Sequence, residues 1–371
     1  MKTVTLLLLV SVFANSQKAN AQLFDSDENK ALIKEAARYI YRSDQTNSEI
    51  AIRRVAAKLP EHPVVPLMEA VFILWREMPM HTSDSIFLVF EDKLREVIDK
   101  SQNLPDKLKA EKIFFEMSAR GFLAEHYADE GAYMKAFGEA HKTYGFMKDG
   151  FGMVDKAPEF LLTSGLYNYF RVAYPEKHPA YKPLLWFFKG GDKQKGIHQL
   201  ERAVDETIIS KVEANLYLSY IYLRYERKPE KAAAYLGNLF KSYPENKYFR
   251  AKYVEALIET GKYSNIPVLI APLQESNKEY YQMAAEVFMG IYYEKHLKKQ
   301  SFATENYQKA IDRIDRLRGQ GYHIISWAYL GLGRTLRESN KDQAREAFRK
   351  AKDYSETDWV KQEAEDYLDK L

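Results

Sequence analysis

The sequence contains no cysteine. Disulfides, thiolate metal sites and the lipid-bearing cysteine of bacterial lipoproteins are therefore excluded, so packing must stabilise the fold. An excess of one charge is lacking as well, because the chain has 55 lysines and arginines and 52 aspartates and glutamates. This balance gives no electrostatic reason to expect nucleic acid or an anionic membrane as a partner.

Long apolar runs are lacking beyond the N-terminus. The run at residues 4–13 is shorter than the roughly 20 residues that a membrane-spanning helix needs, so no transmembrane segment is expected. Lys2 precedes this run, and Ala19 and Ala21 follow it in an A-x-A arrangement. The pattern predicts that residues 1–21 are a secretory signal peptide.

Cleavage between Ala21 and Gln22 would leave residues 22–371 as the mature chain. We expect this chain to be soluble, to form a single domain, and to be exported as a periplasmic or secreted protein of the bacterial cell envelope. The sequence gives no indication of its oligomeric state.

The two-residue alternation typical of strands is not sustained anywhere in the chain. Apolar residues instead recur at three-and-four spacing, as at Leu200, Val204 and Ile208, and turn signals such as LPEHP and SYPENK separate these segments. The spacing predicts helices, and the short connections predict antiparallel neighbours. The predicted fold class is therefore all-α.

Motifs for catalysis are also missing. Neither the zinc motif H-E-x-x-H nor the nucleophile motif G-x-S-x-G occurs. Carboxylates such as Asp312 and Asp315, interleaved with Arg313 and Arg316, are typical of a solvated helix face. We therefore expect no enzyme activity, no metal site and no cofactor.

The stretch GGDKQKGI, residues 190–197, has part of the glycine spacing of a phosphate-binding loop. Gly191 and Gly196 have the separation that G-x-x-x-x-G-K-[ST] requires, but Ile197 and His198 follow instead of lysine and a hydroxyl residue. A preceding strand is also not predicted. This stretch is therefore not expected to bind a nucleotide.

We interpret this stretch as a junction between two helices. Gly190 is expected to end the first helix in a left-handed conformation, and Asp192 is expected to cap the free amides of the second. Gly196 then lies inside the second helix, where the close approach of another backbone would explain a glycine. Lys193 and Lys195 keep an anion site at this helix start open as the alternative.

Internal repetition is present towards the C-terminus. A glycine, an alanine, an aromatic residue and a second alanine recur at one constant offset of about 40 residues. The first set is Gly290, Ala303, Tyr307 and Ala310, and the second is Gly331, Ala344, Phe348 and Ala351. Repetition at this period indicates stacked helical units, each too small to bury its own apolar face.

These residues resemble the tetratricopeptide repeat (TPR) family. In that family a small residue in the first helix of a hairpin allows close approach, and an aromatic residue in the second helix fills the gap beside it. The best match is WAYLGLGRTL at 327–336 with AREAFRKA at 344–351, which has one extra residue between the glycine and the second-helix alanine. The resemblance implies an α-α superhelix, a TPR-like solenoid of antiparallel helix pairs.

A wider match runs from GLYN at residues 165–168 through GGDK to GIHQL, which ends at Leu200. This segment is similar to exported bacterial TPR-like proteins of unknown role, and more remotely to the eukaryotic inclusion-body-clearance family of helical-repeat proteins. The similarity implies helical repeats and supplies no catalytic residue.

The TPR resemblance implies a noncatalytic scaffold whose concave face binds a protein or peptide in the cell envelope. Aligning Ser219, Gly290 and Gly331 on the small first-helix position of the repeat defines a candidate partner-binding face. Its residues are Tyr220, Leu223, Arg224, Val287, Ile291, Glu294, Lys295, Leu332 and Thr335. Replacing Tyr220 and Arg224 together should weaken binding and leave the melting temperature nearly unchanged. The other interpretation, in which the superhelix closes over these positions as core, stays open.

The alternative function is carbohydrate or small-ligand binding in nutrient capture. The tyrosine-rich segment NLYLSYIYLRYE, residues 215–226, supports either function, since rigid amphipathic rings on a groove anchor peptides or sugars. Core packing explains part of this cluster. However, Tyr217 and Tyr220 cannot both lie on the helix face that buries Leu218 and Tyr222.

Overall fold

The structure is a computed structural model that describes residues 23–80, 85–129, 131–155, 157–177, 179, 182 and 188–371. The predicted signal peptide, residues 1–21, and its cleavage site before Gln22 lie outside the described residues.

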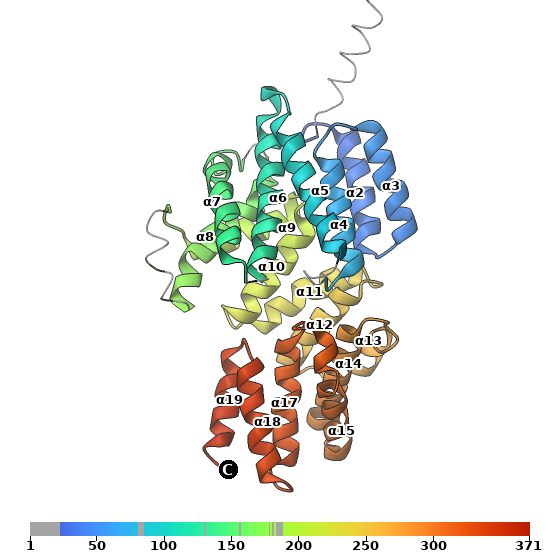
Figure 1. Cartoon of the computed structure of the whole chain (residues 1–371), viewed down its shortest axis with the longest axis vertical. Coiled ribbons are helices and arrows are strands. Elements are labelled where there is room, and N and C mark those ends of the chain that lie inside the picture. The colour runs from blue at the N-terminus through green and yellow to red at the C-terminus, as the bar shows by residue number, and fades with distance from the viewer. Residues whose placement is uncertain are drawn as a thin grey trace, which may run out of the picture. The chain divides into compact units, whose positions relative to one another are not determined.

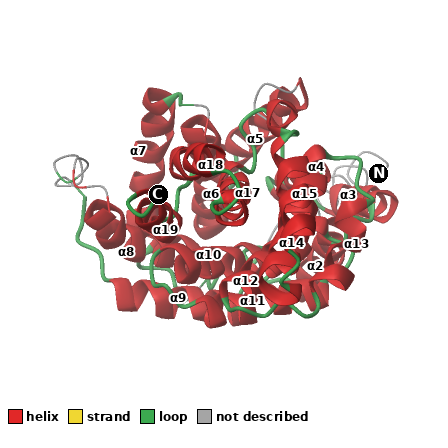
Figure 2. Cartoon of the chain, turned by 90° about the horizontal axis from the view of Figure 1, so that it is seen from below, coloured by secondary structure: helices red, strands yellow, loops and turns green. Residues whose placement is uncertain are grey.

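All regular secondary structure in the described residues is helical, as Figure 2 shows. This confirms the all-α prediction that the three-and-four spacing supports. None of the described helices combines the length and the apolar character needed to cross a membrane.

The contacts within the chain divide it into two compact units, residues 1–217 and 218–371, here named unit 1 and unit 2. Unit 1 contains α2 (Asp27–Tyr41), α3 (Gln45–Lys58), α4 (Val64–Glu77), α5 (Ser85–Gln102), η1 (Asp106–Leu108), α6 (Lys109–Asp129), α7 (Tyr133–Gly150), α8 (Phe160–Lys177) and α9 (Lys193–Glu206). The next helix, α10 (Lys211–Arg224), includes the boundary between the units.

Unit 2 contains the remaining helices. They are α11 (Pro229–Ser242), α12 (Lys247–Glu259), α13 (Ile266–Gln274), α14 (Glu279–Ile291), η4 (Tyr292–Leu297), α15 (Gln300–Ile311), α16 (Ile314–Leu317), α17 (Tyr322–Leu336), α18 (Lys341–Tyr354) and α19 (Asp358–Leu368). The expectation that residues 22–371 behave as a single domain stays a prediction.

Within each unit, consecutive helices pack as pairs. Figure 1 shows α2 to α5 side by side in unit 1, and α17 to α19 side by side in unit 2. The first helix of a pair also contacts the first helix of the following pair. Examples are the contacts of α2 with α4, of α12 with α14, and of α14 with α17. Within each unit, this pairing and stacking form an all-α helical solenoid.

The repeated glycines and the aromatic between them explain the packing of unit 2. Tyr307 on α15 is fully buried, and its ring lies against both Gly290 on α14 and Gly331 on α17. A Cβ atom on either glycine would collide with this ring. Phe348 on α18 has the same relationship to Gly333. The predicted role of glycine in admitting the aromatic ring is therefore confirmed.

The unit that contains Gly290 has the same extra residue before its second-helix alanine, Ala303, and it includes a π-helix, whereas the Gly331 unit has this spacing with an α-helix, α17. After Ile291 the first helix continues as a π-helix, η4, before the chain turns into α15. A π-helix closes its hydrogen bonds one residue further along the chain than an α-helix, so it takes up one additional residue.

The junction at residues 190–197 is confirmed at the start of α9. Asp192 Oδ1 accepts a hydrogen bond from the Lys195 amide at 3.0 Å, which caps the helix. A Cβ atom on Gly196 would lie 2.6 Å from the Tyr169 amide nitrogen, so another backbone does approach closely there. Lys193 forms an ion pair with Glu176 at 3.3 Å.

The expected conformation of Gly190 is wrong. Gly190 is not among the described glycines with positive φ. Phe188 and Lys189, which precede it, are not helical. Because no helix ends at this point, nothing requires the left-handed conformation that a helix C-terminus often needs.

Candidate functional site

Arg224, a predicted partner-binding residue, lies in a buried charge cluster of unit 2. Its guanidinium donates hydrogen bonds to the carboxylates of Glu255 and Glu259, the second at 3.0 Å. Only 12% of its side chain is exposed. Since removing one member of a buried ion pair leaves an uncompensated charge, Arg224 contributes to the fold. The expectation that it can be replaced without loss of stability is corrected accordingly.

Glu255 is the centre of this cluster. Its carboxylate lies 2.9 Å from Lys252 Nζ and 3.5 Å from His323 Nε2. Burial acts to raise the pKa of Glu255, but its interactions with Lys252, His323 and Arg224 hold that pKa well below its usual range. Glu255 therefore stays ionised inside the unit and holds the surrounding cations in place.

Glu294, another predicted residue, is 6% exposed and has a similar structural role. It accepts a hydrogen bond from the Tyr307 hydroxyl at 2.6 Å, and bonds from Arg334 Nε and Nη2 at 2.6 and 2.8 Å. Burial acts to raise the pKa of Glu294, but Arg334, Lys295 and Tyr307 lower it. The carboxylate thus anchors the π-helix to α15 and α17.

Three further predicted residues belong to the core of unit 2. Val287, Ile291 and Leu332 are 0%, 5% and 8% exposed. For Val287 and Leu332 the core interpretation therefore replaces the groove interpretation. Thr335 is half-buried, and its hydroxyl donates to the Leu332 carbonyl at 3.0 Å.

The remaining predicted residues reach the surface to different extents. Tyr220 is 47% exposed, and 37% of the Lys295 side chain is exposed. Leu223 is half-buried. Their part in partner binding stays a prediction.

Ile291 and Lys295 do meet at a cavity of ≈ 290 Å³ in unit 2. The rest of its wall consists of Ile258, Glu259, Tyr263, Trp327, Leu330, Arg334, Trp359 and Glu363. The rings of Trp327 and Trp359 lie 5.8 Å apart, and Trp359 is 40% exposed. The structure therefore brings these members of the predicted face together, and it adds an aromatic pair from α17 and α19.

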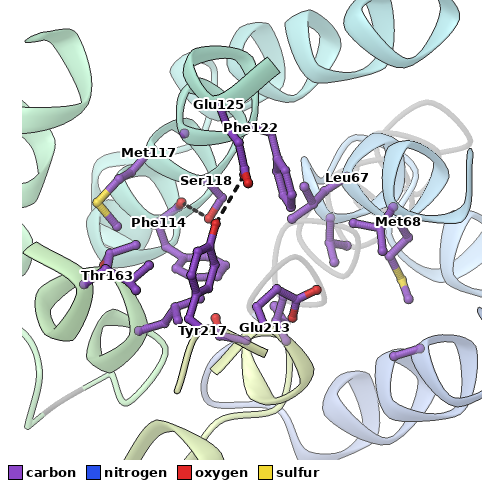
Figure 3. Close-up of a pocket in the computed structure, with 18 of the residues that line it drawn as sticks. Leu67, Met68, Phe114, Met117, Ser118, Phe122, Glu125, Thr163, Glu213 and Tyr217 are labelled. Atoms are coloured by element: carbon purple, nitrogen blue, oxygen red, sulfur yellow. Dashed lines mark hydrogen bonds between the residues drawn. The ribbon is translucent and has the colours of Figure 1, made fainter. Parts of the chain in front are cut away.

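Unit 1 contains a larger cavity, of ≈ 490 Å³, which sequence reasoning missed. It is lined mainly by α2, α4, α6, α8 and α10, with a smaller contribution from α7. Figure 3 shows side chains from α4, α6, α8 and α10 pointing into one shared space. Typical apolar lining residues are Ile33, Leu67, Phe114, Met117 and Leu166. The cavity is thus an apolar concave surface built from facing helices.

Hydroxyl and carboxyl groups are interspersed among the apolar residues of the unit 1 cavity. The Tyr217 hydroxyl donates to Glu125 Oε2 at 3.2 Å, as Figure 3 shows. The Tyr41 hydroxyl donates to Glu213 Oε1 at 2.6 Å. Glu213 Oε2 has no hydrogen-bond partner among the described residues. Such a carboxylate oxygen beside a cavity retains the capacity to accept a bond from a ligand.

The charge in this cavity has one sign. Glu125 and Glu213 line it, and the described lining residues include no lysine, arginine or histidine. Burial raises the pKa of Glu213 to about 7. The hydrogen bond from Tyr41 lowers this pKa, whereas the negative charges of Glu159 and Glu125 raise it further. The Glu213 side chain is only partly exposed, and its Oε2 atom is buried.

Comparisons with known proteins identify no family for the chain. No protein-family model matches it, and no curated protein matches it. Among solved structures, the chain is similar to the TPR domain of P58(IPK), with 13% sequence identity and a TM-score of 0.23. That alignment covers 92% of this chain and 97% of the other. A TM-score of this size carries no argument, so the fold assignment depends on the helical pairing itself.

Proposed function

We propose that this protein is a noncatalytic scaffold that binds a protein or peptide partner through the cavity of unit 1. TPR-like folds commonly serve as protein-interaction scaffolds, although a fold alone does not fix a function. The observation that carries the proposal is the apolar cavity between α2, α4, α6, α8 and α10. Its volume of ≈ 490 Å³ lies within the range of ordinary ligand sites.

The lining favours apolar side chains of a peptide over a sugar at this site. A sugar presents hydroxyls on every side that need donors and acceptors, whereas most residues that line this wall are apolar. Each apolar side chain that moves from water to such a wall contributes about 25 cal/mol of binding free energy per Å² of apolar surface that it buries. Side chains of an amphipathic helix provide that kind of surface.

Export to the cell envelope is part of this proposal. It is supported by the apolar run at residues 4–13 and the A-x-A arrangement that ends at Ala21. Mass spectrometry of the protein recovered from its native host tests it. A mature N-terminus at Gln22 is expected, and an intact Met1 or an acylated N-terminus would contradict export by this route.

A second candidate function is carbohydrate or small-ligand binding at the cavity of unit 2. The specific observation that favours it is Trp359, which is 40% exposed at the cavity and is backed by the buried ring of Trp327, because an exposed indole ring stacks on apolar faces of sugars and similar ligands. Oligosaccharide titration monitored by tryptophan fluorescence distinguishes the candidates. A saturable change that Trp359→Ala abolishes favours this second function.

The decisive test of the first candidate is to fill the unit 1 cavity. Gly121 lines the cavity on α6, and a Cβ atom there would meet no described atom within 4 Å. Gly121→Phe should therefore block the space without strain and should not reduce helix stability. Gly138→Phe on α7 is the matched control, since Gly138 also has no described neighbour within 4 Å and does not line the cavity.

Partners are captured from envelope extract by the unmodified chain and by both variants. We expect Gly121→Phe to lose the captured partner and Gly138→Phe to retain it. Equal capture by all three forms, with unchanged melting temperatures, would remove unit 1 as the binding site.

A further inference from the structure

We infer that the unit 1 cavity selects a peptide segment that is apolar and carries a lysine or arginine, whose cation pairs with Glu213. This inference rests on the proposed peptide-binding function. The occupant is inferred from charge complementarity: the wall is apolar, and its charged groups are the carboxylates of Glu125 and Glu213.

The position of Glu213 makes it the recognition group. Tyr41 donates to Oε1 at 2.6 Å and so fixes the carboxylate, while Oε2 has no hydrogen-bond partner among the described residues. A lysine ammonium or an arginine guanidinium supplies the N–H donors that this oxygen lacks. The resulting charge-assisted bond is stronger than a neutral hydrogen bond and is poorly screened, because the surroundings are apolar.

The same charges act against other occupants. An acidic segment would bring a like charge towards Glu125 and Glu213, with Glu159 contributing from nearby. Like charges in a partly buried site repel each other, so acidic segments are rejected. A wholly apolar segment would leave Glu213 desolvated and unpaired, which weakens its binding relative to the basic segment.

Selection of this kind depends on pH. The groups that face Glu213 are Tyr41 from α2, Glu125 from α6, Glu159 before α8, and Tyr217 on its own helix. In the free chain the pKa of Glu213 is about 7. A cation pairs with the ionised form, so binding lowers this pKa and releases a proton. Affinity for a basic segment should therefore increase about tenfold from pH 6 to pH 8.

The test uses synthetic peptide libraries of defined composition. Each peptide has leucine, isoleucine, phenylalanine, methionine or valine at randomised positions, soluble glycine-serine ends, and a central residue fixed as lysine, leucine or glutamate. The immobilised chain is exposed to the three libraries at pH 6 and pH 8, and bound peptides are quantified by mass spectrometry. Gly121→Phe and Gly138→Phe report whether binding occurs in the cavity.

We expect the lysine library to be retained most at pH 8 and the glutamate library least. Glu213→Gln should remove the preference for lysine over leucine and its pH dependence, while total retention of the leucine library stays the same or increases. Should this variant not fold, the tenfold pH effect on the unmodified chain still tests the inference.

Failure of the inference and failure of the proposed function give different results. Equal retention of lysine and leucine peptides, blocked by Gly121→Phe, would overturn the role of Glu213 and leave the peptide-binding function. Preferred retention of glutamate peptides would also overturn it. No retention of any library above the Gly121→Phe background would contradict peptide binding by this cavity, and the inference with it.

Discussion

Gly196 on α9 lies directly against Gly165 on α8: a Cβ atom on Gly196 would fall 2.8 Å from the Gly165 carbonyl oxygen. On the other side, a Cβ on Gly165 would fall 2.7 Å from Leu200 Cγ and 3.0 Å from the Gly196 carbonyl oxygen. The two helices approach at this point because neither residue has a side chain. A glycine that lowers helix propensity thus serves the packing of the pair.

Gly196→Ala should therefore destabilise unit 1 by about 1–3 kcal/mol, since the added methyl group meets backbone atoms that cannot move independently. The measurement is urea denaturation followed by circular dichroism. Gly190→Ala is the control, because a Cβ atom there meets no described atom within 4 Å. If Gly196→Ala stabilises the protein, as alanine does at an ordinary helix position, that result would contradict the close approach of α8 and α9.

Asp192→Ala should lower the stability by about 1 kcal/mol, because the Lys195 amide loses its acceptor at the start of α9. Asp192→Asn should restore most of that loss, since asparagine caps helices about as well as aspartate. Thermal denaturation of both variants decides between a cap and a purely electrostatic role. An equal loss in both would indicate that the negative charge, and not the cap, stabilises the helix.

Arg224→Ala should destabilise unit 2 by about 3–5 kcal/mol, since it leaves Glu255 and Glu259 without this cation. Tyr220→Ala should cost less than about 1 kcal/mol, because nearly half of the residue is exposed. Arg337→Ala, which removes an exposed pair with Glu338, is the control and should cost less than about 1 kcal/mol. The denaturant midpoints of the three variants measure these losses of stability, and Arg224→Ala should have the lowest midpoint.

Glu213→Gln should stabilise the protein at pH 8 and have little effect at pH 4. The pKa of Glu213 is raised to about 7 in the folded chain, above its usual value of 4.5. The folded state therefore binds the proton more tightly, and stability falls as pH rises from about 4.5 to about 7. The gain from glutamine is on the order of 2 kcal/mol once this loss is complete. A stability difference that does not vary between pH 4 and pH 8 would contradict the raised pKa.

Much of the fold could be predicted because helical packing leaves local marks in the sequence. Gly290 and Tyr307 recur as Gly331 and Phe348 because each repeat needs a glycine beside an aromatic ring, although Gly331 lies against Tyr307 and Phe348 lies against Gly333. The cap at Asp192 could be predicted for a similar reason, as it involves residues only three positions apart. The conformation of Gly190 could not, because it depends on where α8 ends.

The unit 1 cavity could not be predicted, because its lining residues look like ordinary core. Ile33, Leu67 and Phe114 occupy apolar positions of separate amphipathic helices, and nothing local distinguishes a residue that faces a cavity from one that is covered. The one usable signal was the tyrosine-rich segment 215–226, whose Tyr217 does line the cavity. Likewise, Arg224 and Glu255 are far apart in sequence, so their pairing required the fold.

The ring of Tyr307 is shared by successive repeats, and this affects how unit 2 comes apart. Neither α14 nor α17 can separate from α15 without exposing the same buried aromatic surface and the hydroxyl held by Glu294. The nearest-neighbour coupling between these repeats is therefore strong relative to the stability of either alone. Their backbone amides should exchange with deuterium through one common opening event, and half-unfolded forms that proteases could cleave should be rare.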